Sequence, residues 1–145
     1  KPHTLTWNAG KPVSLRTNDR RIALELAMRY EIVHIPEDHD RGPYKVSTRG
    51  YLYSIQSEDG SELLSYHWHP FGNSQITSPH LHVGSVVLAP DAIITKKTHV
   101  PTARISLEQV LRVCISELGV VALRDDWQQL LADSEDMFKL WRTWH

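Results

Sequence analysis

The chain has 145 residues, of which 41% are hydrophobic, a size and composition typical of one domain with its own core. Its 16 Lys and Arg residues nearly balance 17 Asp and Glu residues, which argues against binding of nucleic acid through an extended basic surface. No apolar run reaches the length of a membrane span and the first residues lack the pattern of a signal peptide, so we expect no membrane association and a cytoplasmic location.

The beginning of the chain predicts an irregular arm followed by a helix. Residues 1–17 contain two prolines and a glycine with little periodicity, which indicates an arm with at most one short strand. Asn18 or Asp19 can cap a helix over about 19–33, and the helix formers in that segment favour this interpretation. A strand remains open, because the apolar residues of this segment also alternate: Ile22, Leu24, Leu26, Met28, Tyr30 and Ile32.

The middle of the chain predicts a sheet. Strand-like alternation covers 44–56 and 62–69, and the intervening turn contains Asp59-Gly60, a strong hairpin signal. A third strand is expected from His80, with an apolar run that continues to Leu88. A short segment at 92–95 is expected at the edge of the sheet.

The last third predicts helices. Ser106 and Gln109 have the spacing of a capping box ahead of an apolar helical stripe, and Gly119 lies where that helix is expected to end. Asp125 or Asp126 can cap a second helix, and Ser134 can begin a further turn. Together these elements predict a single α+β domain over residues 1–145, in which an antiparallel sheet of about four strands has helices packed on one face.

Four of the nine histidines form two H-x-H pairs, His67 with His69 and His80 with His82. Alternate residues of a strand share a face about 7 Å apart, and residues on paired strands lie about 5 Å apart, so four rings can converge on one pocket. His99 can join from the following turn. Polar, titratable side chains gathered in this way predict a functional site.

Two chemistries suit these histidines. Neutral imidazoles of His67, His69, His80, His82 and His99 can bind a divalent metal such as zinc, with Glu62 or Asp91 as a further ligand. Without a metal, one catalytic histidine among His67, His69, His80 and His82 removes a proton and another protonates the leaving group, as phosphodiester cleavage requires. Candidate neighbours for a phosphate group are Arg49, Ser65, Lys96, Lys97 and Arg104.

Nucleophilic catalysis by serine or cysteine is not favoured. Cys114, the only cysteine, falls on the apolar stripe of a predicted helix and is expected in the core, and the chain has no G-x-S-x-G segment.

The run GYLYSIQSEDGSELLSYHWHP, followed by SPHLHVG, resembles the TumE-type family of bacterial toxin–antitoxin proteins over about residues 44–84. That resemblance implies a small α+β domain with a Tyr-rich strand, a hairpin and a histidine-bearing stretch, of which Pro79-His80-Leu81-His82 is the closest match. The segment from Thr98 to Leu131 is similar to an uncharacterised bacterial family with a Leu-Arg-x-Asp-Trp element, which draws attention to Arg124, Asp126 and Trp127.

The leading hypothesis is therefore a histidine-dependent or metal-dependent hydrolase, a toxin-type nuclease acting on RNA or on a small phosphate-containing substrate. The alternative is a non-catalytic metal-binding or protein-interaction module of a toxin–antitoxin or regulatory system. An interaction role would use the aromatic residues near the end of the chain as anchors for a protein partner: Phe138, Trp141 and Trp144.

Overall fold

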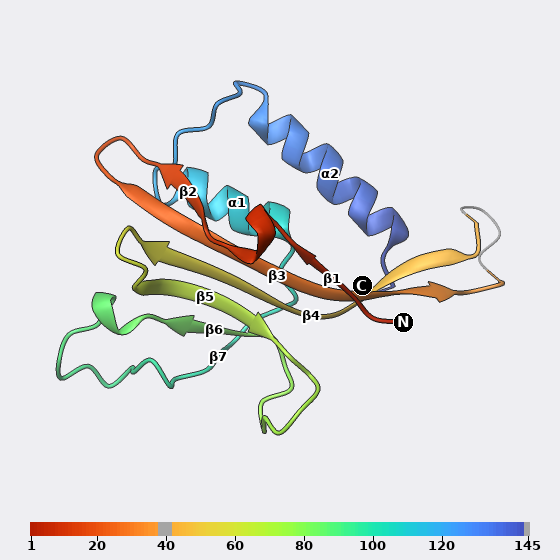
Figure 1. Cartoon of the computed structure of the whole chain (residues 1–145), viewed down its shortest axis with the longest axis horizontal. Helices are drawn as coiled ribbons and strands as arrows, with labels where there is room; N and C mark the ends of the chain where they lie inside the picture. The colour runs from red at the N-terminus through yellow and green to blue at the C-terminus, as the bar shows by residue number, and fades with distance from the viewer. Residues whose placement is uncertain (38–41, 144–145) are drawn as a thin grey trace.

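The computed structural model describes residues 1–37 and 42–143, which form a seven-stranded antiparallel sheet and two α-helices (Figure 1). The strands are β1 (His3–Thr6), β2 (Val13–Arg16), β3 (Arg21–His34), β4 (Tyr44–Ser57), β5 (Glu62–Trp68), β6 (His80–Val83) and β7 (Val100–Pro101). The helices are α1 (Leu107–Ser116) and α2 (Trp127–Trp141), with short 3₁₀ turns η1 (Asn8–Gly10) and η2 (Ser85–Val87). The α+β class is confirmed, but the predicted four strands are too few.

The favoured helix over 19–33 is wrong and the strand that the alternation left open is confirmed, because this segment forms the long strand β3. The strand pairs with β1 and β2 along one edge and with β4 along the other, so its backbone groups are satisfied by neighbours far away in sequence. Its alternating Ile22, Leu24 and Leu26 all face the core. The period of two therefore outweighs the local preference of Ala, Leu and Met for helix.

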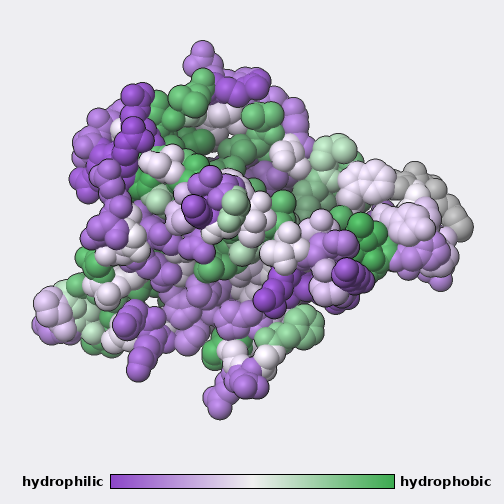
Figure 2. Space-filling model, in the orientation of Figure 1, coloured by the Kyte–Doolittle hydropathy of each residue, from purple (hydrophilic) through white to green (hydrophobic). Residues whose placement is uncertain are grey.

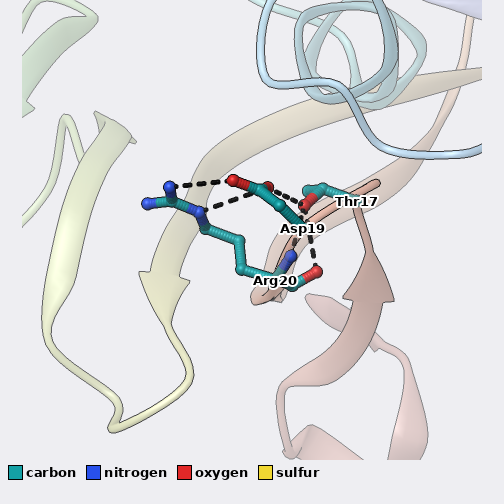
Figure 3. Close-up of polar contacts among 3 residues, drawn as sticks. All are labelled: Thr17, Asp19 and Arg20. Atoms are coloured by element: carbon teal, nitrogen blue, oxygen red, sulfur yellow. Dashed lines mark hydrogen bonds and ion pairs between the residues drawn. The ribbon is translucent and has the colours of Figure 1, made fainter.

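The expected irregular arm over 1–17 is also wrong, since it contains both β1 and β2. The turn that joins β2 to β3 is built from Thr17, Asp19 and Arg20 (Figure 3). The Arg20 backbone N–H donates to the Thr17 hydroxyl at 3.1 Å, and the Arg20 guanidinium donates to the Asp19 carboxylate. Asp19 thus stabilises a turn between strands and does not cap a helix.

The hairpin between β4 and β5 is confirmed. Asp59 accepts a hydrogen bond from the Ser61 backbone N–H at 2.9 Å, and Gly60 adopts a φ of 84°, which glycine tolerates best. The third predicted strand begins at His80 as expected but ends at Val83, where η2 takes over. No strand forms over 92–95, and the edge strand is β7.

The capping box that opens α1 is confirmed. Ser106 accepts from the Gln109 backbone N–H, and the Gln109 side chain accepts from the Ser106 backbone N–H. Gly119, with a φ of 73°, follows shortly after the end of this helix. The second helix follows Asp126 and continues through Ser134 to Trp141, so no separate turn starts at Ser134.

The core lies between the helices and one face of the sheet. Tyr53 and Ile55 of β4 are almost completely buried together with Val110 and Cys114 of α1. Both helices lie on the same side of the sheet (Figure 1), as predicted. Burial also raises the pKa of the Cys114 thiol to about 11, which suits a core residue and not a nucleophile. Within residues 1–37 and 42–143, no α-helix covers the other face of the sheet.

The helices found within 1–37 and 42–143 are too short or too polar to traverse a lipid bilayer. Large exposed apolar side chains occur at scattered places, including Ile93 and Leu123. Figure 2 shows hydrophobic and hydrophilic residues interspersed on the visible face. Of the aromatic residues expected to anchor a partner, Phe138 packs against the core and Trp141 lies 5.2 Å from the Lys45 ammonium, whereas Trp144 lies outside the described residues.

We expect Gly84→Ala to destabilise the fold, because a Cβ at Gly84 would lie 1.6 Å from the backbone oxygen of Glu62. The backbone of β5 must move to relieve this overlap, at a cost of about 2–3 kcal/mol in the free energy of unfolding. Urea unfolding measures the effect. The exposed neighbour Ser85→Ala is the control and should change stability by less than about 0.5 kcal/mol. Equal midpoints for the two variants would show that the close approach of β5 and residue 84 is not required.

Candidate metal centre

The structure brings together all five histidines expected from the sequence, which we call the histidine cluster: His67, His69, His80, His82 and His99. Strand pairing explains the convergence. His67 of β5 lies directly opposite His80 of β6, and His82 lies opposite Ser65 on the same face. His99 immediately precedes β7, which pairs with β6.

The rings of the histidine cluster are in mutual contact. Within the pairs, ring centroids lie 5.9 Å apart for His67 and His69 and 5.0 Å apart for His80 and His82. Between the strands, the His67 ring lies 5.7 Å from that of His80 and 4.8 Å from that of His82. The His99 ring lies 4.8 Å from His80 and 4.5 Å from His82. The cluster is therefore continuous, with His80 at its centre.

The cluster lies on the sheet face opposite the helices, which we call the open face. Residues of β5 with the opposite orientation, Tyr66 and Trp68, pack towards the core as expected. His80 is only 1% exposed although neither α1 nor α2 covers this face, because neighbouring rings pack around it. His69 and His99 are exposed at the rim, so the cluster is reachable from solvent.

Backbone carbonyls fix the orientation of two rings. Nδ1 of His80 lies 2.8 Å from the Ser78 carbonyl oxygen, and Nδ1 of His82 lies 3.1 Å from the Lys96 carbonyl oxygen. A carbonyl only accepts, so Nδ1 carries the proton in both rings and Nε2 keeps its lone pair. This is the tautomer that a metal-binding histidine adopts when a carbonyl orients its other nitrogen.

Two buried nitrogens of the cluster have no hydrogen-bond partner among the described residues: Nε2 of His67 and Nε2 of His80. A buried polar atom without a partner costs about 1–3 kcal/mol, so such atoms call for an explanation. Two of them in one cluster of imidazoles could therefore bind a ligand.

The surroundings keep these rings neutral. Burial is the main cause that lowers the pKa of His67 to about 4, and the neighbouring rings of His82, His80 and His69 add to it. Burial also lowers the pKa of His80, although its hydrogen bond to Ser78 acts in the other direction. Neutral imidazole is the form that ligates metals.

The cluster contains two overlapping groups of three that could hold a metal ion, His67–His69–His80 and His80–His82–His99. In each group one nitrogen from every ring lies within 4.8 Å of the others. A tetrahedral zinc ion with bonds of about 2.0–2.1 Å requires nitrogens roughly 3.4 Å apart, so the rings must approach by at most about 1.4 Å.

Neither carboxylate expected as a further ligand belongs to these groups. Glu62 accepts a hydrogen bond from the Ser54 hydroxyl instead, and Asp91 lies exposed in the segment between β6 and β7. Within 1–37 and 42–143, the candidate ligand groups thus consist of imidazole alone.

The residues expected to position phosphate are dispersed. Arg49 lies on the open face and lines a groove beside His67 and His69, but Arg104 lies 4.0 Å over the Trp68 ring. Ser65 is fully buried beside the cluster. Lys96 contributes its carbonyl oxygen to His82, and the backbone N–H of Lys97 donates to Thr95.

Arg124 and Asp126, noted from the second resemblance, form an exposed ion pair at 2.7 Å ahead of α2. Trp127 is the first residue of that helix. Sequence reasoning missed Arg29 and Phe71, which line the same groove as Arg49. The alternation of β3 puts Arg29 on the polar face of a strand, a signal hidden by the helix interpretation.

The chain matches no protein-family model, and comparisons with curated proteins and with solved structures returned no match. The resemblance to TumE-type proteins therefore stays a prediction.

We expect the metal-free protein to lose stability as the pH falls from about 6.5 to about 4. In this range His67 binds a proton in the unfolded chain, where its pKa has the ordinary histidine value of 6.5, but not in the folded protein, where its pKa is about 4. The free energy of unfolding is highest above pH 6.5 and falls by up to about 3 kcal/mol. Urea unfolding in EDTA from pH 4 to 7.5 measures the slope.

Two variants check the assignment of this slope to the cluster. His67→Gln should flatten it, and His34→Ala, outside the cluster, should retain it. Equal stability of the native chain at pH 7 and pH 5 would contradict the neutral state of the buried rings.

Proposed function

We propose that the histidine cluster binds a divalent transition metal such as zinc and that the protein is a metal-assisted hydrolase of phosphate esters. One observation carries the proposal: Nε2 of His80 is buried without a partner among the described residues at the centre of the cluster, while its Nδ1 is fixed by the Ser78 carbonyl. A metal ion satisfies this nitrogen without a proton, which suits a ring whose pKa is lowered by burial.

His80, His82 and His99 are the favoured ligands. Two of these three rings already have their tautomer set by a backbone carbonyl, whereas the other group contains only one such ring, His80. Three imidazoles leave one position of a tetrahedral ion open, as in catalytic sites. A zinc ion bound there lowers the pKa of a coordinated water towards 7, which is the chemistry it supplies.

His67 and His69 then serve the substrate side, because both line the groove next to these ligands. They can accept a hydrogen bond from the attacking water and orient it. In hydrolysis the water oxygen forms a bond to phosphorus and the bond to the leaving oxygen breaks. One proton of the water passes to the leaving alcohol, and the other stays on the phosphate product or is released to solvent.

Metal-free acid–base catalysis is less favoured. It needs one histidine that holds a proton near neutral pH, which a neighbouring carboxylate usually provides. The shifts resolved in this cluster are both downward, for the pKa of His67 and of His80, and burial is the largest cause of each. A ring with a lowered pKa is a poor general acid near neutral pH but a good metal ligand.

RNA is the substrate that the TumE-type resemblance favours. The formal net charge of −1 favours a small or partner-delivered substrate over tight binding of long nucleic acid. A toxin-type nuclease acting in the cytoplasm is therefore the specific form of this proposal.

A non-catalytic metal-binding module is the second candidate. His80 lies on β6 between His67 of β5 and β7, so an ion bound to it would link the edge of the sheet to its centre. Metal binding would then contribute stability without turnover.

We expect His99→Ala and His82→Ala each to weaken zinc binding about tenfold or more, because each removes one of three ligands. His34→Ala, outside the cluster, should bind zinc like the native chain. Isothermal titration with ZnCl₂ measures the affinities, and circular dichroism checks folding, which replacement of the exposed His99 should not affect.

Zinc-dependent cleavage of a fluorogenic single-stranded RNA, lost in His99→Ala, would support the hydrolase. Stoichiometric zinc with higher thermal stability but no cleavage of RNA or of a nitrophenyl phosphate ester would support the module. Native zinc affinity in both ligand variants would contradict the metal centre altogether.

A further inference from the structure

A groove of about 940 Å³ lies on the open face beside the histidine cluster. Its lining comes mainly from β3, β4 and β5, and His67 and His69 lie on the β5 side. Pro2 and Thr4 from the start of the chain form the opposite wall. The volume is within the range of sites that hold small organic ligands of nucleotide size.

A β-bulge brings a second arginine to this groove. Arg29 pairs with Gly50 and Tyr30 pairs with Thr48, so Arg49 is the extra residue of β4. Without the bulge, alternation would turn Arg49 towards the core, whereas with it Arg49 shares the open face with Arg29. The adjacent Gly50 packs closely against the backbone at the end of β5, since a Cβ there would lie 2.7 Å from the Trp68 carbonyl oxygen.

The groove carries a positive charge that is only partly neutralised. Nε of Arg49 donates to the Glu31 carboxylate at 2.7 Å, which fixes the guanidinium and leaves its remaining N–H groups for a ligand. The Arg29 side chain is exposed and forms no hydrogen bond or ion pair with any residue in 1–37 or 42–143. Two arginines against one glutamate favour an anionic ligand.

An exposed aromatic ring completes the groove. Phe71 follows β5 and is 69% exposed, although it lines the groove close to His69. An exposed Phe in the same groove as two arginines offers a stacking surface together with groups that can bind phosphate. This combination recognises a flat base and a phosphate on the same ligand.

We propose that this groove binds a nucleotide unit, with its phosphate on Arg29 and Arg49 and its base on Phe71. The inference deepens the proposed function and rests on it for its catalytic meaning, because His67 and His69 line the same groove as the two arginines. Ligand binding itself requires no metal. The nucleotide unit can belong to a free nucleotide or to a single-stranded RNA.

The test is isothermal titration of the full chain in EDTA with adenosine 5′-monophosphate and, separately, with a short single-stranded oligoadenylate RNA. Arg29→Gln and Arg49→Gln should each weaken binding about tenfold, since each removes charge-assisted hydrogen bonds to phosphate. Phe71→Ala should weaken it about fivefold or more. Arg21→Gln is the matched control, because it removes the same charge from the same strand outside the groove.

Weaker binding in the groove variants and native affinity in Arg21→Gln would support the inference. If the oligoadenylate binds more tightly than the monophosphate, the natural ligand is a nucleotide unit of RNA. If the two probes bind with equal affinity, the natural ligand is a free nucleotide. Equal affinities in Arg29→Gln and Arg21→Gln, or no binding of either probe, would overturn it. Metal-free titration keeps this result separate from zinc binding, so either proposal can fail alone.

Discussion

The pairing of β5 with β6 is the constraint on which the candidate site depends. Because His67 faces His80 directly, the alternation of each strand directs both H-x-H pairs to the open face and directs Tyr66 and Leu81 to the other. A shift of one residue in either strand would turn its histidines towards the helices. The hairpin before β5 and the close approach at Gly84 fix that register, so the same features that build the sheet also assemble the cluster.

Assembling imidazoles without carboxylates has an energetic cost. Hydrogen bonds from the rings of His80 and His82 to backbone carbonyls recover part of it, but Nε2 of His67 and Nε2 of His80 gain no partner among the described residues. Each such nitrogen costs about 1–3 kcal/mol, which the fold must supply through its core. A ligand that pairs with these nitrogens would return this free energy, so its binding would be coupled to the stability of the fold.

Local signals in the sequence were sufficient for many elements. The Asp59-Gly60 turn, the capping box at Ser106 and the faces of the H-x-H pairs depend on residues a few positions apart, and the structure contains all of them. The sequence favours a helix where β3 forms because helix propensity is also local, whereas the pairing of this strand with β1, β2 and β4 is not. The sequence does not predict the short strands β1 and β2 either, because both form by pairing with β3.

The groove on the open face also depends on β3 being a strand, so the favoured helix does not predict it. Leu24 and Leu26 belong to the core on one face of this strand, and Arg29 belongs to the open face, so one strand connects the packing of α1 to the surface beside the histidines. If this segment were a helix, these residues would not be divided between a core face and an open face in this way. The bulge at Arg49 is still less visible in sequence, since it exists only in the register between two strands. The charge of the groove thus comes from two arginines gathered by pairing, which is how a chain of nearly balanced charge can present a locally basic site.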